Sequence, residues 1–429
     1  MSARIAEVKG RRVWDSRGRP TIEAEIHLAG GAVGRAIAPA GASTGSGEAV
    51  DKRDGGKALG GFDVMRGVAA IDGEIADHLR GHDVIDQEGA DRIMIDLDGT
   101  PDKSRLGGNA LIATSMAIMH AAAAEVELPL WRHLGNSRDD FFLPLPEIQI
   151  FGGGAHAGRR VDVQDFMVIA VGAESYAQAL EWTAEVYLSA GRLMSEAGLM
   201  QGVADEGGFW PAFNSNEQAL DYLMRAIEGA AMRPGEDIAI SLDIAATDFF
   251  REGRYQLSTD NKAMDSDGLS EMLLRWMEIY PIVAIEDPLA EDDFEAMKKF
   301  TTAAGSKVEV IADDFICTSA ARIQKAAAIG ACNTALIKPN QAGTLSETKA
   351  ALDAAGEVNW EAIVSARSGE TEDTTIVHLA IGWGVKQLKV GSFSRSERMA
   401  KWNEGLRIAE SLGQDGGRLA PRSSYPWGK

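Results

Sequence analysis

The chain has 429 residues, of which 45% are hydrophobic and 25% are charged. This balance is typical of a soluble globular protein and excludes a disordered or fibrous chain. Acidic residues outnumber basic ones by 64 to 43, which gives a formal charge of -21. Such a charge repels phosphate backbones and argues against a nucleic-acid partner. The length exceeds the usual single-domain range, so we expect one large and one smaller domain.

The cysteines and the apolar runs indicate the cellular compartment in which the protein is expected. Two cysteines occur, Cys317 and Cys332; they are too few for a disulfide framework, and both lie in apolar stretches that predict burial. The chain starts without the apolar segment of a signal peptide, and no apolar run approaches the length needed to cross a bilayer. We therefore expect a cytoplasmic protein with no membrane association.

The first forty residues alternate short apolar runs with turn residues, which predicts a small antiparallel meander of strands. From Val64 to Leu134 the apolar spacing is helical, most clearly in GNALIATSMAIMHAAAAEVEL, whose alanines and leucines suit a buried helix. Polar turn residues in GNSRDDFFLPLP then precede a strand punctuated by prolines, which predicts a domain boundary. We expect an α+β capping domain over residues 1–138.

Residues 139–429 repeat one unit: a short β-rich run, a polar residue at its end and a helical stretch. Successive polar residues stand 22 to 43 positions apart, about the length of one strand plus one helix in a β/α barrel. They are Asp243, Glu286, Asp313, Lys338, Arg367 and Lys389. We expect a (β/α)8-type barrel, in which the chemistry lies at the carboxyl ends of the strands, so that these six side chains converge on one cavity.

Three of the six residues, Asp243, Glu286 and Asp313, offer only carboxylate oxygens. Strands often end in charged residues because the chain reaches solvent, and for any single position this is the better explanation. Three acids at one barrel mouth, however, would repel one another unless a cation held them. Neither Cys nor His stands among them, so the set favours Mg2+ over Zn2+.

Lys338 follows TALI, a run with little other polarity. Burial and the nearby cations Arg367 and Lys389 are expected to lower its pKa, which would make it a base able to remove a carbon-bound proton. An anion-binding role is equally compatible with its position. Removal of a proton next to a carboxylate is feasible only where cations hold the resulting enolate, and the acid-bound metal would meet that need.

The chain also resembles the enolase family from its first strand to about Leu412. The resemblance is carried, in order along the chain, by the motifs WDSRGRPTIEAE, PAGASTGSGEA, LDGTPDKSRLGGNA, GGGAHAG, ADEGGFWP, SLDIAATDFF, IEDPLAEDD, IADD, IKPNQAGTLSET, SARSGETEDT and RSERMAK. Such a set is highly specific. It implies an enolase-type barrel with a smaller N-terminal domain, a homodimer or higher homo-oligomer, and a small phosphorylated or phosphonylated hydroxy acid as the substrate.

Position by position, the resemblance implies a Mg2+-dependent dehydration. The three acids would bind a first Mg2+. Ser43, in the glycine-rich GAST loop, would contact the substrate and complete a second Mg2+ site once substrate is present. Lys338 would take the proton from C2, and Glu206 would help the C3 hydroxyl to leave. The pairing of a Lys or His base with magnesium is already well known for enolase-superfamily sites, so this implication is inherited from the family.

Four further residues would bind the substrate if the resemblance holds. Arg367 and Ser368 would hold the phosphoryl group by forked and hydroxyl hydrogen bonds respectively. Lys389 would bind the carboxylate. His156, in GGGAHAG, is similar in position to the family's histidine on the phosphoryl side; without that motif, an isolated histidine is more simply explained as a packing residue.

Two residues depart from the family pattern. Asp165, in VDVQDFM, stands where the family has a glutamate that assists hydroxyl departure, so the carboxylate is kept but is one methylene shorter. Ala366, in SARSGETED, replaces a histidine beside the phosphoryl group. Because a methyl cannot hydrogen-bond, this change either weakens phosphate binding or makes room for a bulkier group on phosphorus, and we favour room.

Arg159 and Arg160, in HAGRRV, would suit an added carboxylate on the substrate if they face the pocket; exposure to solvent is an equally good interpretation. With Ala366 and Asp165 they favour a paralogue, of the carboxyphosphonoenolpyruvate synthase kind found in phosphinothricin-type antibiotic pathways, over glycolytic enolase. Glycolytic enolase is the first alternative, because every metal and base position is retained. A non-catalytic binding or structural protein ranks lower, since such drift is expected to erode the metal ligands or Lys338.

Overall fold

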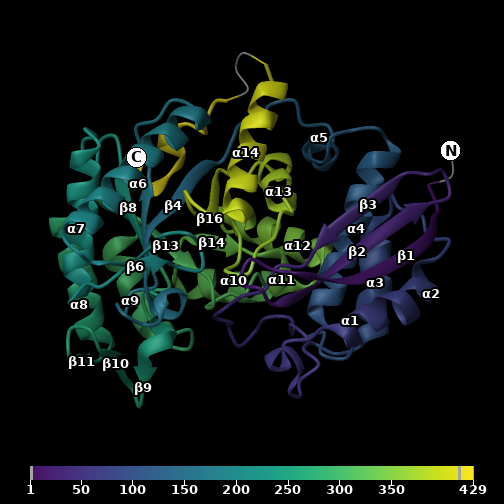
Figure 1. Ribbon diagram of the computed structural model, residues 1–429, viewed down its shortest axis with the longest axis horizontal. Coiled ribbons are helices and arrows are strands. Elements are labelled where there is room, and N and C mark those ends of the chain that lie inside the picture. Colours follow the sequence, from purple (N-terminus) through teal and green to yellow (C-terminus); the bar gives the residue numbers. More distant parts are fainter. Residues whose placement is uncertain (1–2, 414–416, 429) are drawn as a thin grey trace.

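The computed structural model describes residues 3–413 and 417–428. Its N-terminal part is an antiparallel sheet in the order β1-β2-β3, with helices packed against it (Figure 1). The strands are β1 (Ile5–Trp14), β2 (Pro20–Leu28) and β3 (Val33–Ile37), and the helices are α1 (Met65–Ala70), α2 (Ala76–Leu79), α3 (Gln87–Asp98), α4 (Gly108–Glu125) and α5 (Leu130–Gly135). The predicted meander and the helical segment after it are confirmed.

Helix α4 is the centre of this domain. Residues 108–118 are all buried, because the helix is apolar on nearly every side. It packs on β2 and β3, where Ile22 and Ile26 are fully buried. Gly34 of β3 approaches α4 so closely that a Cβ atom there would stand 2.1 Å from the Ala121 nitrogen, so only glycine permits this contact.

The second part is a barrel whose eight strands pair in the order β4-β5-β8-β12-β13-β14-β15-β16, and β16 pairs back with β4. The strands are β4 (Leu145–Gly152), β5 (Asp165–Ile169), β8 (Ala239–Asp243), β12 (Ile282–Glu286), β13 (Glu309–Ala312), β14 (Thr334–Ile337), β15 (Glu361–Ser365) and β16 (Gln387–Ser392). A barrel with a smaller α+β domain beside it is the predicted fold class, which is therefore confirmed (Figure 1).

Helices and short strands complete the barrel domain. The helices are α6 (Tyr176–Glu196), α7 (Asn216–Gly229), α8 (Ser266–Ile279), α9 (Phe294–Ala304), α10 (Ala320–Ile329), α11 (Pro339–Ala342), α12 (Leu345–Glu357), α13 (Thr375–Trp383) and α14 (Ser396–Ser411). The short strands are β6 (Met200–Val203), β7 (Phe209–Pro211), β9 (Phe250–Arg251), β10 (Arg254–Leu257) and β11 (Lys262–Met264). Within the described ranges, no helix combines the length and the apolarity that a membrane span requires.

The start of the barrel differs from the expected repeat of one strand and one helix. β5 runs antiparallel to both β4 and β8, whereas the other neighbouring barrel strands are parallel. Parallel strands need a crossover of about a dozen or more residues, usually a helix, but residues 153–164 contain only the short 3-10 turn Gly154–Ala157. The regular unit therefore begins at β8, and both α6 and α7 follow β5.

The N-terminal domain reaches the carboxyl ends of the barrel strands through the segment 38–50. Ala40 and Gly369 exchange two backbone hydrogen bonds of 2.9 Å each, and the Ala49 nitrogen donates to the Gln341 carbonyl oxygen at 2.8 Å. Gly369 follows β15 and Gln341 follows β14. The loop of the smaller domain is thereby fixed over the end of the barrel at which chemistry is expected.

Candidate active site

The carboxyl ends of the barrel strands and the segment 42–43 enclose a cavity of about 20 Å3, enough for one water molecule. Most residues that the sequence singles out line its wall: Ser43, His156, Asp165, Glu206, Asp243, Lys338, Ala366, Arg367, Ser368 and Lys389. Glu286 and Asp313 lie just behind the wall, in contact with Lys389 and Lys338 respectively. The structure thus brings together side chains that lie on, or directly after, seven barrel strands, β5, β8, β12, β13, β14, β15 and β16, and side chains of the smaller domain.

Three acids and two lysines lie at, or directly beneath, the floor of this cavity, and all five are buried. Asp243 and Glu286 are register partners at the ends of the neighbouring strands β8 and β12, and Asp313 directly follows β13. Lys389 Nζ lies 3.0 Å from Asp243 Oδ2 and 2.7 Å from Glu286 Oε2. Lys338 Nζ donates to Asp313 Oδ2. Each acid is therefore paired with an ammonium group.

Burial and opposite charges compete in this floor. Burial raises the pKa of Glu286 well above its usual range, and the neighbouring Asp243 adds to the rise. For Asp243, burial acts in the same direction, but Lys389 outweighs it and the pKa is lowered. Burial disfavours the charged form of Lys389, yet Asp243 and Glu286 raise its pKa well above the usual value. The buried charges are thus stable only as a compensated group.

The pKa of Lys338 is shifted in the opposite direction to the sequence-based expectation. Burial and the neighbouring cations act to lower it, but the carboxylates of Asp313 and Glu286 outweigh them, so the pKa is raised. The expectation was wrong because the sequence shows which cations stand nearby but not that the closest charged group is Asp313. A neutral Lys338 therefore requires another cation to take up the charge of Asp313.

Asp243, Glu286 and Asp313 suit a hard divalent cation chemically, since all their donor atoms are carboxylate oxygens. Glu286 Oε1 is buried and has no hydrogen-bond partner among the described residues, so one ligand atom is free. The three acids do not, however, form a group whose ligand atoms all lie within 4.8 Å of one another; the groups that do, among the described residues, are Asp287 with Asp313 and Asp314, and His156 with Asp165 and Glu206. To share one ion, the three acids would have to turn away from their lysines.

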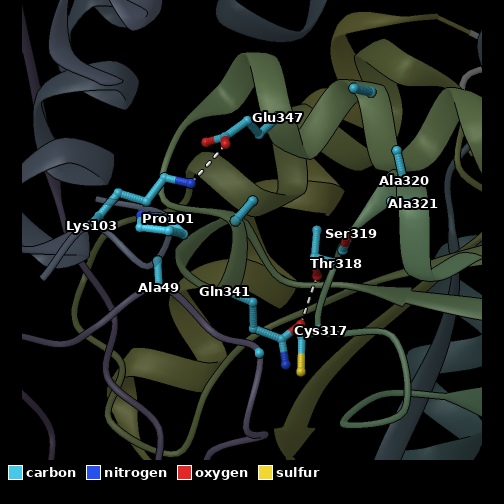
Figure 2. A pocket seen from close by; sticks show the side chains of 13 residues that line it. Ala49, Pro101, Lys103, Cys317, Thr318, Ser319, Ala320, Ala321, Gln341 and Glu347 are labelled. Carbon is cyan, nitrogen blue, oxygen red and sulfur yellow. Dashed lines mark hydrogen bonds and ion pairs between the residues drawn. The ribbon is translucent and has the colours of Figure 1, made fainter. Parts of the chain in front are cut away.

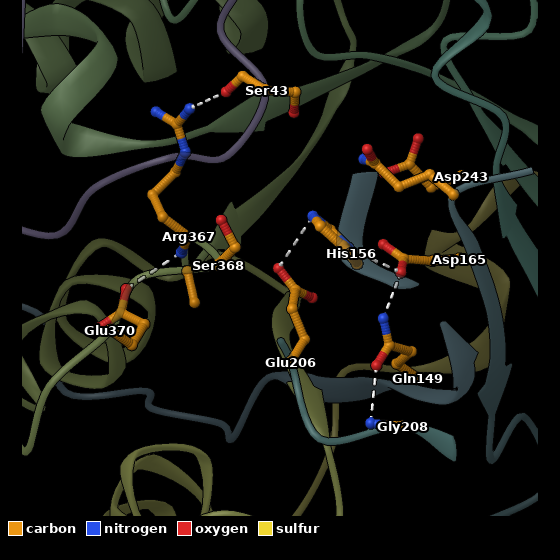
Figure 3. Close-up of polar contacts among 12 residues, drawn as sticks. Ser43, Gln149, His156, Asp165, Glu206, Gly208, Asp243, Arg367, Ser368 and Glu370 are labelled. Carbon is orange, nitrogen blue, oxygen red and sulfur yellow. Dashed lines mark hydrogen bonds and ion pairs between the residues drawn. The ribbon is translucent and has the colours of Figure 1, made fainter. Parts of the chain in front are cut away.

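His156, Asp165 and Glu206 form a second buried cluster at the cavity (Figure 3). His156 Nδ1 lies 3.2 Å from Asp165 Oδ1, and His156 Nε2 lies 3.9 Å from Glu206 Oε1. Burial disfavours the charged imidazole, but Glu206 and Asp165 outweigh it and raise the pKa of His156 to about 9. A protonated imidazole therefore stands between two carboxyl groups at neutral pH.

Arg367 is buried and bound to the loop that covers the cavity. Its guanidinium donates to Glu48 Oε2 at 2.8 Å and to Glu48 Oε1 at 3.1 Å, and to the Ser43 carbonyl oxygen at 2.8 Å. Close by, Ser368 Oγ accepts a hydrogen bond of 3.3 Å from Arg17. An anion that binds Arg367 must therefore displace the Glu48 carboxylate.

Arg159 and Arg160 lie outside the enclosed cavity. Arg159 pairs with Asp248 at 3.2 Å, and 58% of its side chain is exposed. Arg160 is also exposed, and its guanidinium donates to the Ala212 carbonyl oxygen at 3.5 Å. The structure thus favours the solvent-facing interpretation for both arginines, whereas Ala366 does line the cavity.

Sequence analysis missed several polar residues that support the site, namely Arg17, Glu48, Gln149, Gln164 and Gln341. Gln164 Nε2 donates to Asp243 Oδ2 at 3.0 Å, and Gln341 Nε2 donates to Asp313 Oδ1 at 2.9 Å. For Gln149 the signal was its place in the apolar run of PEIQIF, because a buried polar group needs a partner; Gln164 and Gln341 stand beside other polar residues and gave no such signal. Arg17 and Glu48 lie inside the motifs WDSRGRP and GSGEA, which carry the resemblance to the enolase family. Neither residue was assigned a role of its own from the sequence.

A larger cavity of about 310 Å3 is lined by residues of both domains (Figure 2). Lys103 and Glu347, which pair at 2.7 Å, lie on one side of it, and Thr318 and Gln341 lie on another. Gln341 Oε1 accepts a hydrogen bond of 2.6 Å from Thr318, while the amide nitrogen of the same side chain reaches Asp313. No residue predicted to bind metal or substrate lines this cavity in the described chain, so the smaller one is the candidate active site.

Comparison with protein-family models assigns both parts of the chain. The model of the enolase N-terminal domain matches residues 5–134, and the model of the enolase C-terminal TIM barrel domain matches residues 140–422. The two matches follow one another along the chain and cover both the three-stranded sheet with its helices and the complete barrel. The chain therefore belongs to the enolase family.

Proposed function

We propose that the protein is a Mg2+-dependent hydro-lyase of the enolase type, which removes water from a 2-phosphoglycerate-like acid to give an enolpyruvate product. The observation that carries the proposal is the buried contact between Lys338 and Asp313, in a cluster that also contains Asp243 and Glu286. It combines a candidate base with carboxylates able to hold a divalent cation. The enolase family match supports magnesium-dependent chemistry at this place.

In this proposal, Lys338 removes the proton from C2 of the bound acid. The electron pair of the C2–H bond first moves into the carboxylate and gives an enolate. It then forms the C2–C3 double bond as the C3–O bond breaks, and the hydroxyl group takes a proton from Glu206 and leaves as water. Protonated His156, 3.9 Å from Glu206, is the donor that can replace this proton. Asp165 completes the group through its contact with His156.

Asp243, Glu286 and Asp313 are proposed to hold a first Mg2+, whose charge, when it is bound, stabilises the enolate. Ser43 is proposed to complete a second site once substrate is present. Ser43 lies on the loop that covers the cavity, so its approach to a ligand depends on the position of that loop.

The two anionic groups of the substrate are proposed to bind at separate places, the phosphoryl group at the segment after β15 and the carboxylate at the floor of the cavity. Arg367 and Ser368 are the proposed phosphoryl ligands, and Lys389 is the proposed carboxylate ligand. The cavity has a volume of about 20 Å3, and the Arg367 guanidinium is already bound by the Glu48 carboxylate. Substrate entry therefore requires the segment 41–49 to open.

For the substrate itself we favour an acid with a carboxyl group on phosphorus, which would make the protein a carboxyphosphonoenolpyruvate synthase. Ala366 supports this choice, because it lines the cavity beside Arg367 and Ser368 with a side chain that leaves room. Asp165 supports it as the second departure from the family pattern, whereas the exposed Arg159 does not. Glycolytic enolase is the alternative, since every proposed metal and base position is present.

A dehydration assay separates the two substrates. Purified protein with Mg2+ is offered 2-phosphoglycerate or an analogue that carries a carboxyl group on phosphorus, and the enol product is followed. We expect a preference for the analogue. Turnover of 2-phosphoglycerate with ordinary enolase efficiency, together with no reaction of the analogue, would overturn the specific assignment and leave the dehydration chemistry in place.

Restoring the family residues tests the pocket directly. The double variant Ala366→His with Asp165→Glu is expected to gain turnover of 2-phosphoglycerate, because a polar partner for the phosphoryl group and a longer carboxylate return. The matched control Ala366→Val fills the same space without a donor and is expected to lose activity on the analogue without that gain. An unchanged ratio of the two activities in the double variant removes the main support for an altered pocket.

Family membership also leads us to propose a homodimer or higher homo-oligomer. Light scattering on the purified protein checks this, and a molar mass equal to a single chain contradicts it.

A further inference from the structure

Gln149, in the middle of β4, connects the Asp165 carboxyl group to the turn that carries Glu206. Its side chain is fully buried. The amide nitrogen donates to Asp165 Oδ1, and the amide oxygen accepts a hydrogen bond of 2.8 Å from the Gly208 nitrogen (Figure 3). Gly208 stands two residues after Glu206. One amide therefore contacts both of the segments that carry the acids.

We propose that Gln149 is a positioning residue for the acid–base step: it holds Asp165 against His156 and thereby fixes the imidazole that faces Glu206. This inference rests on the proposed dehydration, in which His156 and Glu206 handle the proton of the leaving hydroxyl. Gln149 does not line the cavity, so it acts through its neighbours and is not itself a catalytic residue.

The two oxygens of Asp165 are unequally bound. Oδ1 accepts from Gln149 and lies 3.2 Å from His156 Nδ1. Oδ2 is buried without a hydrogen-bond partner in the described residues and lies 3.9 Å from Lys389 Nζ. Because the ammonium attracts the carboxylate, Gln149 and His156 together oppose rotation of Asp165 toward Lys389, and Gln149 makes the shorter contact with Oδ1. Without Gln149, we expect Asp165 to turn and His156 Nδ1 to lose its partner.

The other end of Gln149 is one of several anchors of the turn that carries Glu206. Tyr187 Oη donates to the Gly207 carbonyl oxygen at 3.1 Å, and the Ser392 nitrogen donates to the Glu206 carbonyl oxygen at 2.8 Å. These bonds remain when Gln149 is changed. The contact with Asp165 is therefore the end of Gln149 whose loss should affect chemistry most.

The first test compares Gln149→Leu, which keeps most of the volume, with Tyr187→Phe, which removes a bond to the same turn but leaves Asp165 untouched. We expect Gln149→Leu to lower kcat about 10- to 100-fold, as is usual for partners that orient site residues, with little change in KM because the proposed phosphoryl ligand Arg367 keeps its place. Tyr187→Phe should stay close to the unchanged protein. Equal losses in the two variants would show that the turn is what matters, and would overturn the proposal.

The second test moves one methylene from one side chain to the other. Gln149→Asn withdraws the amide from Asp165 and is expected to lose kcat. Adding Asp165→Glu to that variant restores the reach between the two groups but not the bond to Gly208, so most of the lost kcat should return. Added to Gln149→Leu instead, Asp165→Glu should restore nothing. If Asp165→Glu returns no activity to the Gln149→Asn variant, the proposal is contradicted.

A spectroscopic measurement keeps the two proposals separate. Long-range 15N–1H spectra of the seven histidines, with His156 assigned through His156→Gln, report the Nδ1 hydrogen bond without any turnover. We expect the His156 signals to shift in Gln149→Leu and not in Tyr187→Phe. A protein that dehydrates neither substrate contradicts the proposed function, whereas unshifted His156 signals contradict the role of Gln149 alone.

Discussion

Arg398, on α14, is the buried support of the segment that carries the proposed phosphoryl ligands. Its guanidinium donates to the carbonyl oxygens of Arg367, Ser368 and Val390 at 2.7, 2.6 and 2.8 Å. We predict that Arg398→Met removes this donor from the Arg367 and Val390 carbonyl oxygens and leaves Ser368 with only the Ser16 hydroxyl, at 3.3 Å. Each buried acceptor that loses its donor costs about 1–3 kcal/mol. The variant also avoids the unfavourable desolvation of the buried Arg398 guanidinium, which offsets part of this cost. The expected loss of stability is therefore on the order of 4 kcal/mol.

Urea unfolding followed by tryptophan fluorescence measures this loss as a lower midpoint. The matched control is Arg407→Met on the same helix, where 65% of the side chain is exposed and the partner is Glu404 at 2.8 Å. That surface pair should contribute less than about 1 kcal/mol. Activity should fall in Arg398→Met only, because Arg367 and Ser368 lose their backbone support. Equal midpoints for the two variants would refute the reasoning.

Three further predictions concern the site. Lys338→Ala should lower kcat about 10²- to 10⁴-fold with an unchanged circular dichroism spectrum; retained turnover would exclude Lys338 as the base. Glu48→Gln removes the carboxylate charge that is paired with Arg367, so calorimetry should show roughly fivefold tighter binding of inorganic phosphate. Weaker binding would show that Glu48 and phosphate do not compete for Arg367. Mg2+ at about 100 times its Kd should stabilise the fold by about 2.7 kcal/mol in thermal unfolding, and Glu286→Gln should remove most of this effect; an equal effect in the variant excludes Glu286 as a ligand.

The positions of the acids could be predicted because strand burial is strongly patterned. Asp243 and Glu286 each end an apolar run, and all residues of β8 are buried, so the first charged side chain marks the barrel mouth. Lys389 was expected at the end of its strand but is the third residue of β16. It still reaches the cavity, because alternate residues of a barrel strand point inward.

Features that depend on a second chain segment were not predictable in the same way. The sequence around Lys338 contains its cations but gives no distance to Asp313, so the direction of the pKa shift was wrong. The direction of β5 depends on what connects it to β4, and the glycine-rich connection gives no clear periodicity. Gln149 shows only as a polar residue in an apolar run; its partners Asp165 and Gly208 come from other strands and turns.

The contacts of the site predict that binding of the proposed metal and binding of the proposed substrate are linked. Each carboxylate proposed to bind the metal is paired with a lysine that acts on the substrate in the proposal. Asp243 and Glu286 pair with Lys389, the proposed carboxylate ligand, and Asp313 pairs with Lys338, the proposed base. A cation that draws the acids away leaves buried ammonium groups uncompensated, and an anion that draws Lys389 away leaves buried carboxylates uncompensated.

Binding of Mg2+ alone or of the substrate anion alone therefore leaves buried charges uncompensated, and binding of the second ligand removes this cost. Each ligand should strengthen the binding of the other by the same factor. Calorimetric titration of Mg2+ with and without a saturating, non-reactive substrate analogue measures this factor, which is typically about 5- to 150-fold for coupled sites. Lys389→Met removes one of the paired charges and should reduce the factor, because Asp243 and Glu286 no longer have to exchange an ammonium for the metal. Equal Mg2+ affinities with and without the analogue would show that these ion pairs do not govern binding.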